Sequence, residues 1–330
     1  MNKKQLYEVA EQLMTPGKGI LAADESIETA TKRLKAFDIE SNEDSRRAYR
    51  DLFLSTEGIE NYLNGVILFD ETIKQDNSAG IPFAQLLTQK GILPGIKVDG
   101  GKEIDPNSPK ETLTVGLVGL AERLSEYKHM GAKFTKWRAV IKIEGDTLPS
   151  KSNIRMEAKR LAQFALVSQQ IGLVPIVEPE VLHDGNHTLE RAAEVEQLTL
   201  QAVFEELESV GVDLKALILK PSMVLPGKDA VSSTPEEVAK STAEVLLATV
   251  PKKLAGVVFL SGGQEPEEAT KNLGAIVKAE KFPWPISFSF ARALQTPALT
   301  VWRGKEENIE KARDVFTQRL KQNQLAIQLD

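Results

Sequence analysis

Eight short apolar runs recur along the chain of 330 residues, and several of them are apolar at every position. Residues 66–69, 216–219 and 257–260 show this most clearly. Continuous apolar runs of this length are typical of parallel strands that are covered on both faces. The sequence therefore predicts eight such strands, which begin near Ile20, Val66, Ile96, Phe134, Val174, Ala216, Val257 and Ile286.

Segments with helical spacing fill the intervals between these runs. Apolar residues recur at steps of three and four in residues 161–171 and 200–210, and also near the two ends of the chain in residues 6–13 and 309–320. Such spacing places the apolar side chains on one face of a helix. Residues 234–237, Thr-Pro-Glu-Glu, predict a helix start, because threonine caps a helix, proline suits its first turn and glutamate completes a capping box.

The alternation of strand and helix, repeated about eight times, decides between two α/β architectures. It favours a (β/α)8 TIM barrel, which typically needs about 250 residues. The alternative is an open, doubly wound sheet, which usually carries a glycine-rich phosphate loop after its first strand. Here the first run leads instead into Ala-Ala-Asp-Glu-Ser at residues 22–26. We therefore expect a single barrel domain over residues 1–330, with an additional helix at each end.

Lys220 stands at the end of the sixth apolar run and is followed by a proline that ends the strand. Burial disfavours the ammonium ion and lowers the pKa of a lysine, and an uncharged amine can attack a carbonyl to form a Schiff base. The alternative is a lysine whose stem is buried while its charged end reaches water. The functional interpretation is favoured because the other predicted strands end in polar residues too.

In a TIM barrel the C-terminal ends of the strands share one opening, where the chemistry takes place. Every predicted strand of this chain delivers polar groups to that end. Surface charges scattered at random would not all fall at the same end of the strands. In strand order these groups are Asp24; Asp70 and Glu71; Lys97 and Asp99; Lys136 and Arg138; Glu178 and Glu180; Lys220; Ser261, Gly262 and Gly263; and Ser287, Ser289 and Arg292.

Strand spacing predicts which of these groups meet. Lys136 and Arg138 are two residues apart, so they share one face of their strand. If Lys136 faces the barrel interior it approaches Lys220, and a neighbouring cation lowers the pKa of a lysine further. Glu178, on the strand between them, would supply a general acid or base.

Two groups of residues are candidate anion sites. Residues 261–263, Ser-Gly-Gly, can form a nest of backbone N–H groups, and Arg292 beside it would complete a phosphate clamp. An ordinary tight loop is the alternative for the glycines. Lys97 and Arg33 could form a second pocket that binds an anion. Arg33, however, stands in a predicted helix, where surface arginine is common.

Composition argues against several other functions. A net charge of −6 and a pI of about 5.4 do not suit a nucleic-acid-binding protein. The chain has no cysteine and no apolar run of membrane-helix length, and its first residues lack the apolar core of a signal peptide. These features fit a cytoplasmic location without a membrane partner. His129, His183 and His187 do not form a zinc-ligand pair on a strand end, so we expect no metal.

Eight ordered motifs, which cover about residues 7 to 303, resemble those of a known family, the class I, Schiff-base fructose-bisphosphate aldolases. The set in this order is far more specific than any one of its members. The motifs are GKGILAADES at 17–26, GVILFDET at 65–72, PGIKVD at 94–99, FTKWR at 134–138, VPIVEPE at 174–180, LKP at 219–221, FLSGGQ at 259–264 and RALQ at 292–295.

This resemblance implies a homotetrameric TIM barrel of glycolysis and gluconeogenesis, without a metal or other cofactor. It implies reversible cleavage of fructose 1,6-bisphosphate to dihydroxyacetone phosphate and glyceraldehyde 3-phosphate. At the matching positions, Lys220 forms an imine with the C2 carbonyl, and Glu178 handles the protons of carbinolamine formation and dehydration. Lys136 is the cation beside the imine, with Glu180 as its support, and Asp24 takes the proton from the C4 hydroxyl.

The resemblance also implies two regions that bind the rest of the sugar phosphate. The positions that hold the C1 phosphate are matched by Ser261, Gly262, Gly263, Ser289 and Arg292. The positions around the second phosphate or the open-chain hydroxyls are matched by Arg33, Ser26, Lys97 and Arg138.

The chain departs from the family pattern in three places. Residues 27–28 are Ile-Glu where Thr-Gly is common, and residues 290–291 are Phe-Ala where Tyr-Gly is common. The last tyrosine is Tyr127, so the tyrosine-ended tail of animal members is absent. This leaves open which group exchanges the C1 proton and whether fructose 1,6-bisphosphate is preferred to fructose 1-phosphate. A metal-dependent aldolase and a non-catalytic binding protein are the two other hypotheses.

Overall fold

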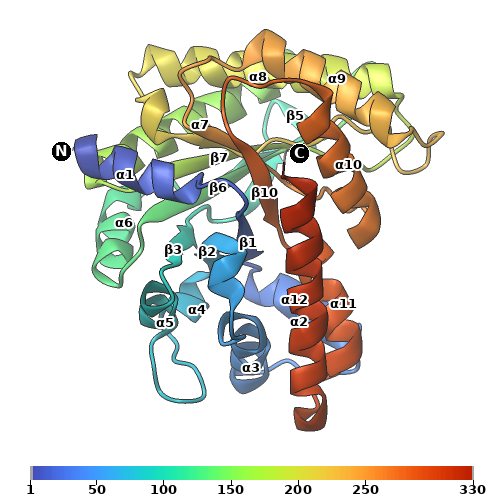
Figure 1. Cartoon of the computed structure of the whole chain (residues 1–330). Helices are drawn as coiled ribbons and strands as arrows, with labels where there is room; N and C mark the ends of the chain where they lie inside the picture. Colours follow the sequence, from blue (N-terminus) through green and yellow to red (C-terminus); the bar gives the residue numbers. More distant parts are fainter. Residues whose placement is uncertain (1–2, 329–330) are drawn as a thin grey trace.

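Eight parallel strands close into a barrel in the computed structural model, which describes residues 3–328 (Figure 1). The order around the barrel is β1, β10, β9, β8, β7, β6, β3 and β2, so that β1 pairs with both β10 and β2. This closure confirms the predicted TIM barrel and excludes the open sheet. The barrel strands are β1 (Gly19–Ala23), β2 (Leu63–Leu68), β3 (Leu93–Lys97), β6 (Phe134–Ile141), β7 (Val174–Val181), β8 (Ile218–Leu219), β9 (Gly256–Phe259) and β10 (Ile286–Phe290).

The structure differs from the predicted strands in two places. The apolar run that was expected to form a strand from Ala216 begins as a 3-10 turn, η2 (Leu214–Ala216), in which Asp213 accepts a hydrogen bond from the backbone of Lys215, so β8 is short. An additional antiparallel hairpin follows β3 and consists of β4 (Lys102–Asp105) and β5 (Ser108–Thr114). Its first strand is mostly exposed and has no apolar run, which is why the pattern did not predict it.

Helices surround the barrel, and they include those that the spacing predicted. The capping box at Thr234 is present, because its hydroxyl accepts from the N–H of Glu237 and the Glu237 carboxylate accepts from the N–H of Thr234. The helices are α1 (Lys3–Leu13), α2 (Ile27–Lys35), α3 (Glu43–Leu54), α4 (Asp70–Ile73), α5 (Phe83–Gln89), α6 (Leu120–His129), α7 (Lys151–Ile171), α8 (Leu189–Ser209), α9 (Pro235–Thr249), α10 (Pro266–Ala279), α11 (Arg292–Trp302) and α12 (Ile309–Ala326), with 3-10 turns η1 (Ile59–Asn61) and η3 (Glu306–Asn308).

Helix α1 closes the N-terminal end of the barrel. Its buried side chains Leu6, Ala10 and Leu13 pack with a cluster of strand side chains that point into the barrel, among them Phe134 and Ile218. A second, larger core lies between the strands and the outer helices, where α12 packs beside α11 (Figure 1). Because apolar side chains fill the α1 end, the polar groups of the strands gather at the opposite, C-terminal end.

Candidate active site

Lys220 directly follows β8, and backbone contacts on both sides hold it in place. Its N–H donates to the carbonyl of Val177 at 2.8 Å. Two residues later, the hydroxyl of Ser222 accepts from the N–H of Val181 and donates to the carbonyl of the same residue, both at 3.0 Å. Lys220 is only 3% exposed. Its ammonium group therefore lies inside the protein, and the alternative of a charged end in open water is excluded.

Glu178, on β7, lies between two lysines. Its Oε1 atom is 3.0 Å from Nζ of Lys220, and its Oε2 atom is 2.9 Å from Nζ of Lys136. Burial alone would raise the pKa of Glu178, but the charges of Lys136 and Lys220 outweigh burial and hold the pKa below its ordinary value. The side chain is therefore a carboxylate at neutral pH, within reach of a proton from Lys220.

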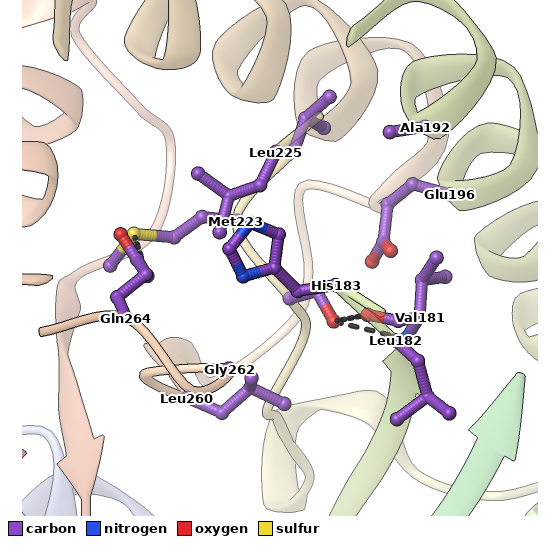
Figure 2. A pocket seen from close by; sticks show the side chains of 12 residues that line it. Val181, Leu182, His183, Ala192, Glu196, Met223, Leu225, Leu260, Gly262 and Gln264 are labelled. Atoms are coloured by element: carbon purple, nitrogen blue, oxygen red, sulfur yellow. Dashed lines mark hydrogen bonds between the residues drawn. The ribbon is translucent and has the colours of Figure 1, made fainter. Parts of the chain in front are cut away.

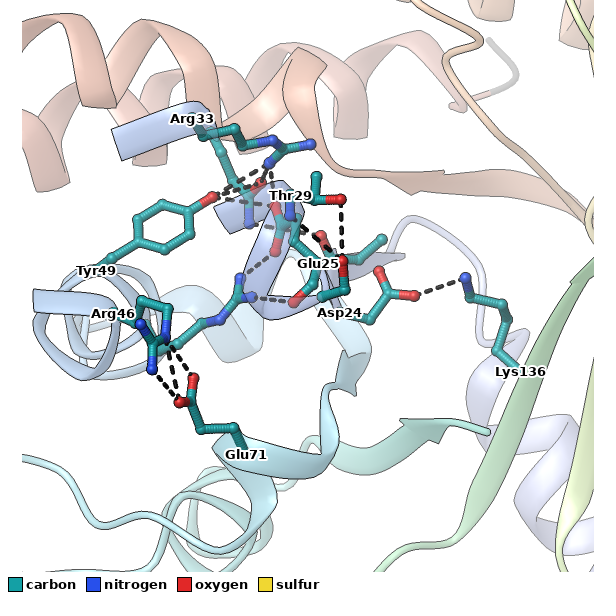
Figure 3. A network of polar contacts seen from close by, with 12 residues as sticks. Asp24, Glu25, Thr29, Arg33, Arg46, Tyr49, Glu71 and Lys136 are labelled. Atoms are coloured by element: carbon teal, nitrogen blue, oxygen red, sulfur yellow. Dashed lines mark hydrogen bonds and ion pairs between the residues drawn. The ribbon is translucent and has the colours of Figure 1, made fainter. Parts of the chain in front are cut away.

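Asp24 follows β1 and meets the same group of charges. Its Oδ2 atom lies 2.6 Å from Nζ of Lys136 (Figure 3). Burial favours the neutral acid, yet Lys136 and Lys220 hold the pKa of Asp24 well below its usual range. Burial disfavours the charge on Lys136 as well, but the two carboxylates raise its pKa well above the usual value. Lys136 is thus a permanent cation between Asp24 and Glu178.

A second set of ion pairs surrounds these residues. Glu180, two residues beyond Glu178 on β7, pairs with Nε of Arg138 on β6 rather than with Lys136, which it was expected to support. Lys97, at the end of β3, lies 2.5 Å from Oδ1 of Asp99, whose other oxygen accepts a hydrogen bond from the N–H of Arg138 at 3.3 Å. Lys136 and Arg138 were predicted to share one face of β6. Both bind carboxylates of neighbouring strand ends, so this shared face points toward the mouth of the barrel.

The loop after β9 has the backbone of an anion-binding nest. Gly262 and Gly263 both have positive φ angles, 58° and 89°, which glycine adopts without strain. A Cβ atom on Gly263 would lie 3.3 Å from Nη2 of Arg292, so this guanidinium lies against the loop. Ser261 is buried in the same loop, and the buried hydroxyl of Ser289 on β10 has no hydrogen-bond partner among residues 3–328. These donors are suited to an anion.

Residues 290–291 are Phe-Ala where the family commonly has Tyr-Gly, and the structure accommodates both residues. Ala291 precedes α11 with a φ of −109°, on the side of φ that all L-residues can adopt, so its position does not require glycine. Phe290 is buried and lies 5.5 Å from Phe288, measured between ring centroids.

A small cavity of about 10 Å³ adjoins the glycine loop (Figure 2). Gly262 and Ser222 contribute to its wall, together with Glu196 from α8. Burial, and secondarily the charge of Glu180, raise the pKa of Glu196 well above its ordinary value. Burial thus favours the uncharged acid at Glu196, in the wall that the cavity shares with the glycine loop.

Ser26 directly precedes α2 and Arg33 lies on it, at the rim of the mouth. Ser26 caps this helix, because its hydroxyl accepts a hydrogen bond from the N–H of Thr29 at 3.3 Å. Arg33 is not a surface residue, since its side chain is 16% exposed. One of its nitrogens, Nη1, donates to Glu25, to Gln295 at 2.7 Å and to Tyr49 at 3.2 Å (Figure 3).

Sequence reasoning missed the cluster around Glu25. This carboxylate binds Arg33 through one oxygen and Arg50 of α3 through the other, and the hydroxyl of Tyr49 donates to it at 3.0 Å. Burial favours the neutral acid, but the two arginines hold the pKa of Glu25 below its ordinary value. Its position next to Asp24 was the one available signal.

Three predicted strand-end residues do not join the cluster. Asp70 and Glu71 belong to α4 and contact the outer helices: Asp70 accepts from the hydroxyl of Tyr127 on α6 at 2.8 Å, and Glu71 pairs with Arg46 on α3 at 2.5 Å. Ser287 lies toward the opposite end of the barrel, and its hydroxyl donates at 2.6 Å to the carbonyl that precedes β1. The prediction that every strand contributes to the mouth is wrong for these residues.

Metal-ligand groups and long apolar helices are both absent from the described part of the chain. Within residues 3–328, no group of three or more His, Cys, Asp and Glu side chains is arranged to hold a metal ion. No helix in the same range is long and apolar enough to cross a membrane.

The fold and this mouth define the chain as a barrel enzyme whose buried lysines and carboxylates are suited to carbonyl chemistry. The model of a glycolytic family described as fructose-bisphosphate aldolase class-I matches residues 5–329. A probable class 1 fructose-bisphosphate aldolase from Xanthomonas axonopodis pv. citri (strain 306) is 47% identical over 328 residues, which cover 99% of this chain and 98% of that protein. The cytoplasmic isozyme from Spinacia oleracea is 48% identical over 320 residues, which cover 97% of this chain and 89% of that protein.

A solved structure is also similar over nearly the whole chain. It is described as a ternary co-crystal structure of fructose-bisphosphate aldolase from Plasmodium falciparum in complex with TRAP and a small molecule inhibitor. The two share a TM-score of 0.96 and 45% sequence identity, with 98% of this chain and 94% of that chain covered.

The chain belongs to the class-I fructose-bisphosphate aldolase family. It is a lyase, and its activity is the reversible aldol cleavage of fructose 1,6-bisphosphate in glycolysis. The predicted family, fold and reaction are therefore confirmed. The cytoplasmic location of the spinach relative agrees with the location expected from the sequence.

Proposed function

We propose that this cleavage proceeds through an imine on Lys220, with Glu178, Lys136 and Asp24 as the other catalytic residues. The observation that supports the proposal most directly is an unbroken series of contacts. Lys220 lies 3.0 Å from Glu178, Glu178 lies 2.9 Å from Lys136, and Lys136 lies 2.6 Å from Asp24. The two carboxylates that would accept protons, Glu178 and Asp24, therefore each lie next to a lysine, as a reaction through an imine requires.

Imine formation needs one base that later acts as an acid. Glu178 accepts a proton from the ammonium of Lys220, and the freed amine attacks C2 of the open-chain sugar to give a carbinolamine. The Glu178 carboxyl then returns its proton to the departing hydroxyl, so that water leaves and a protonated imine remains. Glu178 ends this half of the reaction as a carboxylate, as it began.

Cleavage of the C3–C4 bond uses the opposite side of the mouth. Asp24 takes the proton from the C4 hydroxyl, a C4 carbonyl forms, and the electrons of the C3–C4 bond move into the imine to give an enamine and glyceraldehyde 3-phosphate. The enamine is then protonated and the imine hydrolysed to release dihydroxyacetone phosphate. The charge of Lys136 keeps Asp24 ionised beforehand and remains beside the reacting atoms throughout.

The remaining residues hold the ends of the sugar. The C1 phosphate binds the nest of residues 261–263 together with Arg292, because backbone N–H groups and a guanidinium make a strong phosphate clamp. Ser289 offers an unpartnered hydroxyl to the same group. On the other side, Ser26, Arg33, Lys97 and Arg138 bind the second phosphate or the open-chain hydroxyls. Glu180 keeps Arg138 in place through their ion pair.

Borohydride reduction in the presence of dihydroxyacetone phosphate tests the proposal, because it converts an imine into a stable amine. We expect one adduct per chain, which peptide mass mapping assigns to Lys220. Lys220→Ala should lose the adduct and nearly all cleavage while it keeps its circular dichroism spectrum. Lys215→Ala, an exposed lysine on the same segment, is the matched control and should behave as wild type. An adduct on another lysine, or substantial turnover by Lys220→Ala, would contradict the proposal.

We further infer that residues 1–330 act as one catalytic domain and assemble into a homo-oligomer, a tetramer by resemblance to the family. Sugar phosphates are the partners that the family model supports. Light scattering after size exclusion tests the assembly, and a monomeric mass at micromolar concentration would contradict it.

A further inference from the structure

Glu25 is a buried carboxylate to which the proposed chemistry gives no role. It is the residue next to Asp24, and its side chain points away from the mouth into a cluster formed by α2, α3 and α11 (Figure 3). One oxygen binds Arg33 and Tyr49, the other binds Arg50, and Arg50 also donates to the backbone carbonyl of Glu25 at 2.9 Å. Both the side chain and the backbone of this residue are therefore fixed.

The cluster holds Arg33 by one end only. Its Nη1 atom carries all the hydrogen bonds of the side chain, to Glu25, Tyr49 and Gln295. Within the described part of the chain, Nε and Nη2 of Arg33 have no hydrogen-bond partner, and in Figure 3 one terminal nitrogen points away from Tyr49 without a dashed line. Two or more donors of this guanidinium are thus left for a ligand.

A second cation of the mouth, Arg292, lies within electrostatic reach of Arg33. Burial lowers the pKa of Arg292, and the charge of Arg33 is the next largest contribution to that lowering, so the two guanidinium groups are within electrostatic reach of each other. Two cations this close repel each other, so Arg33 needs an anion of its own to stay in place. Glu25 binds Nη1 of Arg33 alone, so this carboxylate can hold the guanidinium in place and leave the donors on Nε and Nη2 to a ligand.

We propose that Glu25 is a positioning residue for the aldol reaction: its buried carboxylate, held by Arg50, aims Arg33 at the substrate and fixes the backbone that carries Asp24. The inference rests on the proposed roles of Arg33 and Asp24. Gln295 assists, since its amide oxygen accepts from Arg33 and its amide nitrogen donates to the carbonyl of Ala22 on β1 at 3.4 Å. Strand β1 and three helices meet in this one cluster.

Glu25→Gln tests the proposal, because it keeps the shape of the side chain and removes its charge. Arg33 and Arg50 then lose their shared anion, so we expect KM for fructose 1,6-bisphosphate to rise about tenfold and kcat to fall about tenfold. The rate of borohydride trapping with dihydroxyacetone phosphate should stay within about twofold of wild type. That ketone has neither a C4 hydroxyl nor a second phosphate, so it does not depend on Asp24 or Arg33.

Glu71→Gln is the matched control, because Glu71 also binds an arginine of α3, Arg46, but contacts neither Arg33 nor Asp24. It should leave KM, kcat and trapping within about twofold of wild type. A Glu25→Gln enzyme with wild-type KM and kcat would overturn the proposal. A parallel loss of trapping and cleavage would overturn it too, because that result indicates a general loss of structure.

A second variant keeps the proposal testable if Glu25→Gln does not fold. Tyr49→Phe removes one hydrogen bond to Glu25 and one to Arg33 without a change in charge. We expect the same selective loss of cleavage, by about threefold, and wild-type behaviour would overturn the proposal. If the wild-type protein itself forms no adduct, the proposed function fails; if wild type reacts normally and both variants match it, only the role of Glu25 fails.

Discussion

Nζ of Lys136 lies 2.6 Å from Oδ2 of Asp24, which joins β6 to β1 across the mouth of the barrel although these strands are not neighbours in it. Lys136 also reaches Glu178, so one cation stands between two buried carboxylates. Burying either carboxylate alone would favour its neutral acid. The ammonium of Lys136 is therefore what allows a base for cleavage and a base for imine formation to be ionised in the same cavity.

Lys136→Met should lower kcat by about 10²- to 10³-fold, because both neighbouring carboxylates lose a cation. Lys136 lowers the pKa of Asp24, so its removal raises that pKa, and the acid limb of the pH–kcat profile should move to higher pH. The profile of the coupled aldolase assay between pH 5 and 9 measures this shift. Lys142→Met, an exposed paired lysine just beyond the same strand, is the control and should leave the profile in place. An unshifted acid limb in Lys136→Met would contradict the assigned role.

Asp24→Asn should separate the two halves of the reaction. The amide keeps an oxygen near Lys136 but cannot accept the proton of the C4 hydroxyl, so cleavage should fall by about 10³-fold. Imine formation with dihydroxyacetone phosphate does not involve that hydroxyl, and borohydride trapping should persist. Asp70→Asn, which also lies just beyond a barrel strand but pairs with Lys74, should keep both activities. Equal losses of trapping and cleavage in Asp24→Asn would argue that Asp24 is structural.

The central site could be predicted from sequence because parallel strands bring their C-terminal ends together. Once eight strands were counted, Asp24, Lys136, Glu178 and Lys220 had to approach one another, whatever the detail of the helices. The same rule failed at Asp70 and Glu71, because α4 begins at the end of β2 and carries both residues outward. The rule locates the backbone of a strand end, and it does not fix the direction of the chain after that end.

The cluster around Glu25 could not be predicted, because it depends on how helices pack. Tyr49 and Arg50 belong to a run of α3 that is buried at every position from residue 49 to residue 54, although its sequence mixes charged and apolar residues. A charged residue in a predicted helix normally indicates the solvent face. Only the placement of α3 against α2 and α11 turns Arg50 into a partner for Glu25.

Gly263→Ala should weaken binding of the C1 phosphate. Its φ of 89° strains any side chain, and the added Cβ would lie 3.3 Å from Nη2 of Arg292, so both the nest and the guanidinium must shift. We expect KM for fructose 1,6-bisphosphate and for fructose 1-phosphate to rise by about tenfold or more, since both sugars carry this phosphate. Steady-state kinetics with the two substrates measures the change.

Gly211→Ala is the control for that experiment. Gly211 has a φ of 80°, and nothing lies within 4 Å of the position that an added Cβ would take, so the variant has a similar backbone strain far from the mouth. It should cost about 1–2 kcal/mol of stability and leave both KM values unchanged. If the two glycine variants have the same small effect on KM, the loop after β9 does not bind phosphate.

Glu157 links α7 to the β4–β5 hairpin, the part of the fold that the sequence pattern did not predict. Its Oε1 atom accepts from the N–H of Thr114 at 2.7 Å and from the hydroxyl of the same residue at 3.0 Å. Burial nevertheless raises the pKa of Glu157 to about 7, because the hydrogen bonds from Thr114 offset only part of the cost of removing the charge from water.

Glu157→Gln should therefore change how stability depends on pH. The folded protein binds this proton more tightly than the unfolded chain, so the contribution of Glu157 is fully present below about pH 4.5 and is lost as the pH rises through 7. Wild type should lose about 3 kcal/mol from this group between pH 4.5 and 8, and the variant should not. Urea unfolding of both proteins at pH 5 and pH 8 measures the difference, with the exposed Glu205→Gln as control. Parallel pH dependences in wild type and Glu157→Gln would show that Glu157 titrates alike in the folded and unfolded chain.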